Sequence, residues 1–423
     1  MVRLVDETEF YSRLKLTRQK LGINQKVMAT LLGVGINGED KVCRWEAGKG
    51  NVPKSALAAL SRLPLKLPYQ SAIKKPRFDF IDLFAGIGGI RLPFQEIGGR
   101  CVFTSEWDRH SQITYAANFG EVPEKNGDIT KFKANEIPPH DILLAGFPCQ
   151  AFSQAGKKRG FLDTRGTMFF EIQRVLAYHK PKAFLLENVK QLKGHDKGRT
   201  LETIMAILRG ETAVDIPDDL KISGAIKDSL ETKLEYDCDY RVLRARDFGV
   251  PQIRERLYII GIRRDANKGV CHDRISSIFN RVLEKHRAKK TLGEILSKDQ
   301  SITRQFTISD KLWIGHQERR KRNRDNGKGF GYSLFTNDSE YCSTISARYY
   351  KDGSEILIDQ SNLGLNPRKI TPEEARSLQG FPEDFIIDMV GKTQIYKQFG
   401  NSVAVPVIRA IVKELIPEVF DGF

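Results

Sequence analysis

Residues 77–99 read RFDFIDLFAGIGGIRLPFQEIGG, in which an apolar segment, a cluster of glycines and a second apolar segment follow one another. The pattern predicts a β-strand over residues 78–84, a turn at Gly86–Gly89 and a helix that continues to Ile97. A glycine turn between a strand and a helix lets backbone amides approach a ligand at the helix N-terminus. Taken alone, such a turn is equally typical of a purely structural connection. It predicts a β-α fold, and the neighbouring segments indicate the ligand.

The next two segments contain carboxylates where a nucleoside ligand needs them. CVFTSEW, residues 101–107, predicts a second strand and delivers Glu106 twenty residues after Gly86, a spacing that suits ribose hydroxyls. GDIT, residues 127–130, places Asp128 at the end of a further predicted strand. The turn is G-x-G-G and not the G-x-G-x-x-G of pyrophosphate-binding proteins. We therefore expect S-adenosylmethionine, rather than a nicotinamide dinucleotide, as the cofactor.

A cysteine follows another predicted strand, in LLAGFPCQAFSQAGKKRGF, residues 143–161. The strand is interrupted at residues 146–148, so Cys149 lies where open α/β sheets keep their chemistry. A reactive thiol needs an electropositive setting, and Lys157, Lys158 and Arg159 follow closely. From this stretch alone, a small buried hydrophobic residue is an equally good interpretation.

A carboxylate stands directly after an apolar strand in AFLLENV, residues 183–189. The strand is predicted to end at Leu186, which leaves Glu187 and Asn188 at its carboxyl end. A charged group is costly in an apolar setting unless it is used. We interpret Glu187 as functional.

Two arginines precede the next strand, in QIRERLYIIG, residues 252–261. Arg254 and Arg256 are two residues apart, so an extended backbone points both guanidinium groups to one side. A pair of this kind favours a phosphate or carboxylate ligand. The alternative is a solvated charged edge.

The first 66 residues predict several short helices and carry twelve Lys and Arg against six Asp and Glu. The segment LTRQKLGINQKVMATLLGV, followed by VCRWEAGKGNVP, resembles the helix-turn-helix of phage-repressor-type regulators, whose recognition helix enters the major groove. In that motif Gln25 would open the second helix, and Trp45 and Glu46 would lie just beyond the recognition helix. The glycine-rich, acidic GINGED, residues 35–40, departs from the pattern and leaves a plain helical docking module as the alternative. Residues 67–76 are predicted to form a proline-containing linker.

The regular β-α alternation is lost over residues 263–366. HQERRKRNRDNGKGFGYS is strongly basic, and STISARYYKDGSEILID shows the alternation of a strand. Basic clusters between short strands suit a nucleic-acid surface, although a charge run is also typical of an ordinary solvated face. Residues 367–423 predict a helix over 371–378, a GNSV turn and a last long helix that returns to the first α/β domain.

Composition limits the functional classes. The 423 residues carry a formal net charge of +15 and have a pI near 9.4, which favours a polyanionic partner. The six cysteines contain no C-x-x-C pair, so neither a zinc site nor a disulfide framework is indicated. No signal peptide and no run of 18 apolar residues is present, so we expect a cytoplasmic protein without membrane association.

Together, the glycine turn, Glu106, GFPCQ, ENV, QIRER and FGNSV resemble the bacterial DNA (cytosine-5)-methyltransferase family over residues 77–415. Within it, STISARYYKDGSEILI resembles the recognition region of enzymes that methylate CC(A/T)GG-type sites. The resemblance implies an α/β fold: a Rossmann-like S-adenosylmethionine-dependent sheet with helices on both faces, residues 77–262. It further implies a small β-rich target-recognition domain, residues 263–366, and a C-terminal segment, residues 367–423, that returns to the catalytic domain. The all-α helix-turn-helix domain, residues 1–66, would precede these units.

The same resemblance implies the catalytic roles. Cys149 would attack carbon 6 of cytosine, because carbon 5 is too weak a nucleophile without covalent activation. Glu187 would hold the proton at ring nitrogen 3, and Arg254 and Arg256 would bind the ring carbonyl and the adjacent phosphate. A water held near Gln150 or Asn188 would remove the proton from carbon 5.

For the cofactor, Phe84 and Trp107 would pack on adenine, Glu106 would bind the ribose and Asp128 the adenine amino group. The full expected cofactor set is Phe84, Gly86, Ile87, Gly89, Glu106, Trp107, Asp128, Ile129, Pro148, Asn401 and Ser402. The target base must be flipped out of the duplex, and residues 150–166 would close over it as a lid. The expected DNA contacts are Ser153, Lys157, Lys158, Arg159, Arg319, Arg320, Thr344 and Arg348.

The resulting hypothesis is an enzyme that methylates carbon 5 of a cytosine in a short duplex site, as part of a restriction-modification system. We expect it to act as a monomer on that site, near the bacterial nucleoid, with double-stranded DNA as partner, no metal, and promoter DNA as a second partner of the N-terminal domain. The alternatives are an RNA cytosine-5 methyltransferase, a transcriptional regulator with an inactive methylase domain, and a generic Rossmann oxidoreductase.

Overall fold

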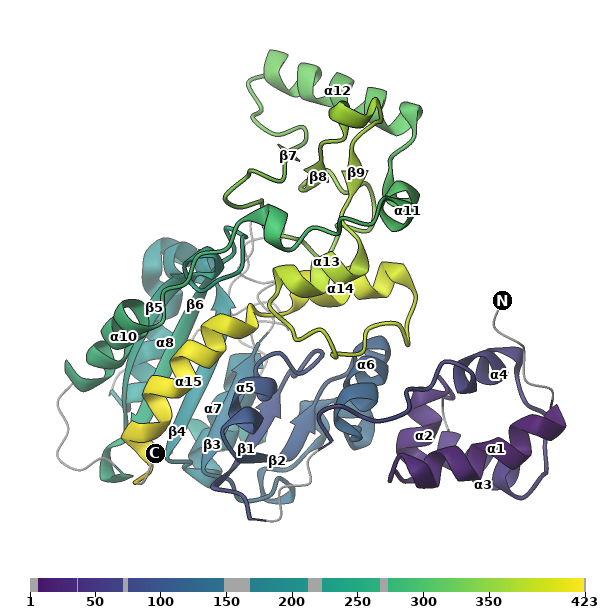
Figure 1. Cartoon of the computed structure of the whole chain (residues 1–423). Helices are drawn as coiled ribbons and strands as arrows, with labels where there is room; N and C mark the ends of the chain where they lie inside the picture. The colour runs from purple at the N-terminus through teal and green to yellow at the C-terminus, as the bar shows by residue number, and fades with distance from the viewer. Residues whose placement is uncertain are drawn as a thin grey trace.

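The computed structural model describes residues 7–35, 37–70, 75–147, 168–211, 223–266 and 273–421. Its centre is a six-stranded sheet with the order β2-β1-β3-β4-β6-β5 (Figure 1). The strands are β1 (Phe78–Leu83), β2 (Gly99–Ser105), β3 (Ile142–Gly146), β4 (Ala183–Val189), β5 (Tyr236–Arg244) and β6 (Glu255–Arg263). Neighbours among β2, β1, β3 and β4 pair in parallel, whereas β6 runs antiparallel to both β4 and β5. This sheet confirms the predicted α/β fold class.

Helices cover both faces of the sheet, because its strands are apolar on both sides. In β1, Ile81 and Leu83 belong to one hydrophobic cluster, and Phe78 and Phe80 belong to the other, as the two-residue period of a strand requires. The first face is covered by α7 (Met168–His179), α8 (Arg199–Arg209) and α9 (Gly224–Leu230). The second is covered by α5 (Arg91–Glu96), α10 (Asp273–Lys285) and α15 (Val405–Val419).

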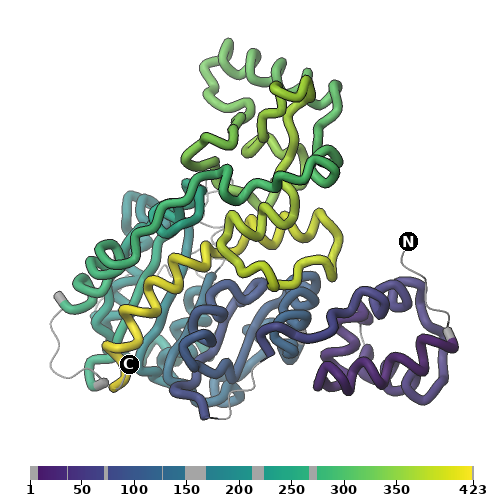
Figure 2. The backbone as a smooth tube through the Cα atoms, in the orientation of Figure 1, coloured from purple at the N-terminus to yellow at the C-terminus, as the bar shows by residue number. Residues whose placement is uncertain are grey.

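The C-terminal segment returns to this domain. Helices α13 (Pro372–Leu378) and α14 (Lys392–Asn401) lie beyond one end of the sheet, and α15 runs back beside α5 and α10, as the course of the chain in Figure 2 shows. Thr371 begins α13 with a capping box, in which its hydroxyl accepts from the Glu374 amide. The GNSV turn, residues 400–403, lies where α14 ends and before α15 begins.

The region predicted to read DNA contains little regular strand. Of the predicted range, residues 263–366, the first part forms α10 and packs on the sheet. The remainder contains α11 (Gln300–Thr303), α12 (Asp310–Asp325) and the short strands β7 (Leu334–Phe335) and β8 (Leu357–Ile358), and β8 pairs with β9 (Arg368–Lys369) just beyond the range. The strand expected over STISARYYKDGSEILID is therefore wrong except at β8. The amides of Tyr349, Lys351 and Gly353 bond to carbonyls three or four residues earlier, which makes consecutive turns.

The N-terminal region forms four helices, α1 (Glu7–Lys20), α2 (Gln25–Leu31), α3 (Gly38–Glu46) and α4 (Lys54–Leu60). The prediction that Gln25 opens the second helix is confirmed, and Asn24 caps that helix through the Val27 amide. Trp45 and Glu46 were expected beyond the third helix, but they form its last turn, because α3 begins only at Gly38. The shift follows from GINGED, where Asn37 has a φ of 57° and delays the start of the helix.

These four helices share their hydrophobic cluster with the catalytic part of the chain. The cluster includes Ala116 and Ala117 of α6 (Arg109–Phe119), together with Met389. The described part of the expected linker is docked as well, since Leu67 is buried and the Tyr69 amide bonds to the Asn118 carbonyl. Residues 67–70 therefore do not form a free spacer.

Candidate active site

The glycine turn after β1 is bonded to the end of β2. Phe84 adopts a left-handed φ of 57°, a conformation that is costly for an aromatic residue and is often found at functional sites. Its amide donates to Ser105 Oγ at 3.2 Å, and the Gly86 amide donates to Glu106 Oε2 at 2.8 Å. The two expected cofactor loops thus meet at one end of the sheet.

Glu106 is held in place from three directions. Its second oxygen accepts from the Asp108 amide at 2.7 Å, and Gln112 Nε2 donates to its backbone carbonyl. Burial raises the pKa of the Glu106 carboxyl, although the backbone amides of Asp108 and Gly86 lower it. A Cβ on Gly127 would lie 1.8 Å from the Glu106 carbonyl oxygen, so only glycine allows this approach.

Asp128 lies beside that contact but not at a strand end. It stands between two single-turn 3-10 helices, Lys125–Gly127 and Ile129–Lys131, so the strand expected before it is wrong. The Asp128 Oδ1 atom accepts from both the amide and the hydroxyl of Thr130. The local Asx turn takes the place of the strand.

The remaining expected cofactor residues differ in how exposed their side chains are. The Trp107 side chain is 75% exposed, whereas Ile87 and Ile129 are 2% and 3% exposed. The two isoleucine side chains belong to the hydrophobic core and offer almost no surface to a ligand. Asn401 is exposed, and Ser402 Oγ would lie 2.9 Å from a Cβ on Gly89, so the GNSV turn closes directly against the glycine turn.

Glu187 lies within β4 and not after it, opposite Tyr258 of β6 and Gly146 of β3. Its side chain is buried, and Oε1 lies 3.1 Å from Nε of Arg256. Burial raises the pKa of Glu187, while Arg256 and Arg254 act in the opposite direction. The site therefore holds a carboxyl group that takes up a proton more readily than an exposed one.

Arg254 and Arg256 have different surroundings, contrary to the expectation that both face a ligand. Arg254 is 2% exposed and donates to the backbone carbonyls of Ile345, Gly400 and Ser402. It joins the start of β6 to the GNSV turn and to the recognition region. Arg256 is the arginine that lies beside Glu187.

The Asn188 side chain also forms its hydrogen bonds within the protein. Its Nδ2 donates to the Phe147 carbonyl at 3.3 Å, and its Oδ1 accepts from the Val189 amide. It therefore anchors the chain two residues before Cys149. Seven expected site residues lie outside the described residues: Pro148, Cys149, Gln150, Ser153, Lys157, Lys158 and Arg159.

Comparison with known proteins identifies the chain. The model of the family C-5 cytosine-specific DNA methylase matches residues 78–211 and 217–417. Type II methyltransferase M1.ScrFI of Lactococcus lactis subsp. cremoris is 48% identical over 410 residues, covering 97% of this chain and 96% of that protein. Type II methyltransferase M.NlaX of Neisseria lactamica is 52% identical over 340 residues, covering 80% of this chain and 96% of that protein.

The chain belongs to the C-5 cytosine-specific DNA methylase family. The fold agrees, since the structure of the Entamoeba histolytica methyltransferase EhMeth superposes with a TM-score of 0.62 at 19% identity, covering 82% of this chain and all of that one. The methylase is thus a DNA (cytosine-5)-methyltransferase, which confirms the enzyme class inferred from the sequence. Membership also excludes the oxidoreductase alternative.

The expected DNA-reading residues fall into two groups in this methylase. Arg319 donates to Asp352, to the Gly331 carbonyl and to His316, so it stabilises the recognition region internally. Arg320 is exposed and lies over the Tyr332 ring at 4.8 Å. Thr344 is half-buried and Arg348 is exposed.

Sequence reasoning missed Asp82 and Gly127. Asp82 is fully buried within β1, and neither of its carboxylate oxygens has a hydrogen-bond partner among the described residues. The signal was available, because a charged residue inside FDFIDLF stands out as Glu187 does in AFLLENV. Gly127 directly precedes Asp128, and its role appears only when the loop is seen against Glu106.

The residues present fit an adenosine-containing cofactor. The exposed Trp107 ring offers a stacking surface, the buried Glu106 carboxylate has lone pairs for hydroxyl groups, and Gly89 leaves room at the junction with Ser402. The fold and the family are those of S-adenosylmethionine-dependent methyltransferases. Within the described ranges, His, Cys, Asp and Glu nowhere form a group of three suited to a metal ion. None of the helices in that part of the chain has the length and apolar character needed to cross a membrane.

Proposed function

We propose that this methylase acts on a cytosine flipped out of a short duplex site, as the modification enzyme of a restriction-modification system. The observation that carries the proposal is the buried Glu187 beside Arg256, adjacent to the strand β3 that leads through Phe147 to Cys149. Relatives named Type II methyltransferases align over nearly their whole length. We place it in the bacterial cytoplasm near the nucleoid, acting as a monomer on its site.

In the proposed reaction the Cys149 thiolate forms a bond to carbon 6 of cytosine, which makes carbon 5 nucleophilic. Glu187 carries a proton and donates it to ring nitrogen 3 as negative charge develops on the ring. Arg256 fixes the Glu187 carboxyl and faces the flipped base. After transfer, loss of the carbon 5 proton to a water releases Cys149 from carbon 6. Asn188 holds the Phe147 carbonyl, two residues before Cys149 in the sequence.

S-adenosylmethionine supplies the electrophilic methyl group. We propose that Trp107 and Phe84 hold its adenine, Glu106 its ribose hydroxyls and Asp128 the adenine amino group, with Asn401 and Ser402 closing the pocket. Arg254 acts through the backbone: by bonding to the carbonyls of Ile345, Gly400 and Ser402 it keeps the GNSV turn against the glycine turn.

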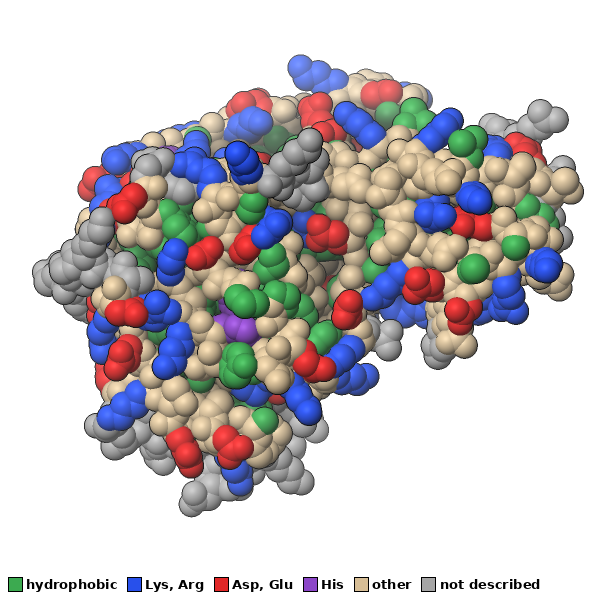
Figure 3. All heavy atoms as spheres, turned by 90° about the horizontal axis from the view of Figure 1, so that it is seen from below, with side chains coloured by type: hydrophobic (Ala, Val, Ile, Leu, Met, Phe, Trp, Pro, Cys, Tyr) green, Lys and Arg blue, Asp and Glu red, His purple; other side chains and the backbone are tan. Residues whose placement is uncertain are grey.

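We propose that duplex DNA binds between this end of the sheet and the recognition region, with Arg320 and Arg348 among the contacts. The other end of the sheet, away from the recognition region, is a less suitable DNA surface. Its Lys and Arg side chains are interspersed with Asp and Glu and form no continuous basic surface among the coloured side chains (Figure 3). The target sequence is set by bidentate contacts in the major groove.

We further propose that residues 1–66 bind promoter DNA through a helix-turn-helix made by α2 and α3, and repress transcription of the methylase gene. The arrangement of α1–α4 and the basic excess support this role. M1.ScrFI aligns with 97% of this chain, so its sequence also contains most of the N-terminal region. M.NlaX matches only 80% of this chain although 96% of its own length aligns, which is consistent with a separable unit.

Methyl incorporation tests the catalytic proposal. The full chain, labelled S-adenosylmethionine and bacterial DNA should give labelled 5-methylcytosine, whereas Cys149→Ser should give none and still bind DNA. Full activity of Cys149→Ser would contradict the mechanism. Transfer RNA serves as the competing substrate, and preferential labelling of RNA would favour the RNA methyltransferase alternative. Bisulfite sequencing of DNA from an expressing host then identifies the site.

A further inference from the structure

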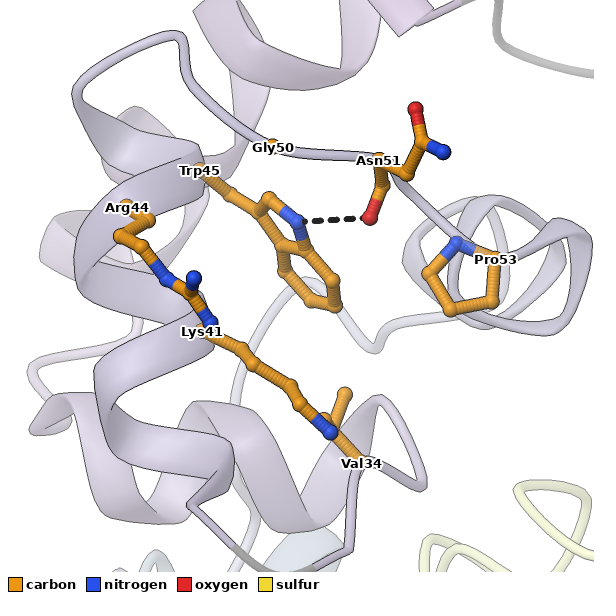
Figure 4. A pocket seen from close by; sticks show the side chains of 7 residues that line it. All are labelled: Val34, Lys41, Arg44, Trp45, Gly50, Asn51 and Pro53. Atoms are coloured by element: carbon orange, nitrogen blue, oxygen red, sulfur yellow. Dashed lines mark hydrogen bonds between the residues drawn. The ribbon is translucent and has the colours of Figure 1, made fainter.

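A hollow of about 160 Å³ lies beside α3, at the loop that connects α3 to α4 (Figure 4). Its lining comes from three short segments of the N-terminal region. The lining residues are Val34, Lys41, Arg44, Trp45, Gly50, Asn51 and Pro53. None of these lining residues is among those assigned to methyl transfer.

Two cations line one side of this hollow. Lys41 and Arg44 are three residues apart on α3, so they project from one face of the helix. Among the described residues, neither has a carboxylate within ion-pair distance. Two other arginines of the region do have carboxylate partners, since Arg13 bonds to Glu9 and Arg18 to Glu46. The hollow therefore has positive charge that the fold does not neutralise.

The other walls are mixed, since Val34, Trp45 and Pro53 are apolar and Asn51 is polar, and two of their backbone carbonyls already accept hydrogen bonds. Trp45 is 3% exposed, and its indole Nε1 donates to the Asn51 carbonyl at 3.1 Å. The Gly50 carbonyl accepts from the Tyr11 hydroxyl. An anion entering the hollow thus meets the two cations, apolar surface and the Asn51 side chain, while the carbonyl oxygens of Gly50 and Asn51 are already bonded.

We propose that this hollow binds one phosphodiester of duplex DNA, with the phosphate oxygens on Lys41 and Arg44 and the deoxyribose against Trp45 and Pro53. The inference rests on the proposed DNA-binding role of residues 1–66 and names the subsite within it. Since α3 would enter the major groove, a phosphate held at its side fixes the depth and register of the helix without reading sequence.

The test uses the full chain with Trp107→Phe and Trp313→Phe, which leaves Trp45 as its only tryptophan because the sequence contains three. The probe is a duplex of alternating A and T, in which no cytosine site exists. We expect saturable change of the Trp45 fluorescence. Lys41→Gln with Arg44→Gln should weaken binding about tenfold and lower the slope of log affinity against log salt by about 1.

Arg13→Gln is the matched control, because Arg13 is a basic residue of the same region that is paired with Glu9. It should leave the salt slope unchanged. Made in the chain that keeps Trp107 and Trp313, Lys41→Gln with Arg44→Gln and the Arg13→Gln control should retain methylation of cytosine-containing DNA. An unchanged slope in the Lys41/Arg44 variant, with duplex still bound through residues 1–66, overturns the subsite alone. Binding by Δ1–66, which lacks Trp45, is compared with that of the full chain in an electrophoretic mobility shift of the same duplex. If the two chains bind equally well, the DNA-binding role itself is overturned. If inorganic phosphate saturates Trp45 and the duplex binds no more tightly, the hollow is a free-anion site and the proposal fails.

Discussion

Glu187 Oε1 lies 3.1 Å from Nε of Arg256, although the two residues come from strands that run in opposite directions. Burial favours the protonated carboxyl and the arginine favours the ionised one, and burial is the larger of the two effects, so the pKa of Glu187 is raised. The Glu187 carboxyl therefore binds a proton more readily than an exposed carboxyl does, as the proposed proton donor to ring nitrogen 3 must.

Replacing Glu187 should remove the proton donor without removing the fold. We expect Glu187→Gln to lower kcat by about 10²–10⁴-fold and to change KM for DNA much less. Steady-state methylation with an unfolding curve at one pH separates the two effects. Glu255→Gln is the control, because Glu255 is a neighbouring β6 carboxylate paired with Lys190 and Arg244; equal losses in both variants would argue against a specific role for Glu187.

Asp82 should make the stability of the protein depend on pH. Burial, opposed by Arg91 and reinforced by Glu106, raises the pKa of Asp82 to about 7. The folded protein then keeps a proton that the unfolded chain releases near pH 4, so the free energy of unfolding falls as pH rises from about 4 to about 7. We expect Asp82→Asn to remove most of this fall, up to about 4 kcal/mol, in urea unfolding without cofactor. Asp79→Asn should keep it, and a slope identical in wild type and Asp82→Asn would contradict the prediction.

Gly127 should be required for cofactor binding. In Gly127→Ala the new Cβ would lie 1.8 Å from the Glu106 carbonyl oxygen, so the Glu106 loop must move. A displacement of this size should raise KM for S-adenosylmethionine about 10²-fold. Gly315→Ala is the control, since nothing lies near that position in α12 and alanine favours a helix. An unchanged KM in Gly127→Ala would separate Glu106 from cofactor binding.

Deleting residues 1–66 should leave methylation measurable but weaken the fold. The deletion exposes Ala116, Ala117 and Met389, which are buried in the cluster shared with the N-terminal helices. Loss of about 3 kcal/mol of apolar burial lowers the melting temperature by about 4 °C in a protein of this size. Differential scanning calorimetry of both chains checks the value; an unchanged melting temperature would show that the two parts fold independently.

The sequence predicted the positions of β1, β2, β3, β4 and β6 well, because an apolar run is a local signal, but it placed the end of β4 too early and expected a strand before Asp128 that does not form. Glu106 and Glu187 were found in this way. The direction of β6 was not predictable, since it depends on the path of the chain between β4 and β6. The carbonyl partners of Arg254 were missed for a similar reason: they lie about a hundred residues or more further along the chain.

The recognition region was predicted least well. Alternating residues in STISARYYKDGSEILID satisfied the strand pattern, but local bonds such as Ser346 Oγ to Glu355 favour compact turns. Arg319 shows the same limit, because a basic run on a helix does not reveal which of its members is used internally by Asp352.

Because β6 is antiparallel, its first residues lie beside the last residues of β4, with Val189 opposite Arg256. The long connection between these strands includes α8, α9 and the edge strand β5, and the pairing of β4 with β6, not the length of this connection, sets the separation of Glu187 and Arg256. The family match is interrupted within this connection, between residues 211 and 217. An affinity tag or a whole reporter domain inserted there should be tolerated, which makes this connection the natural place to engineer the enzyme.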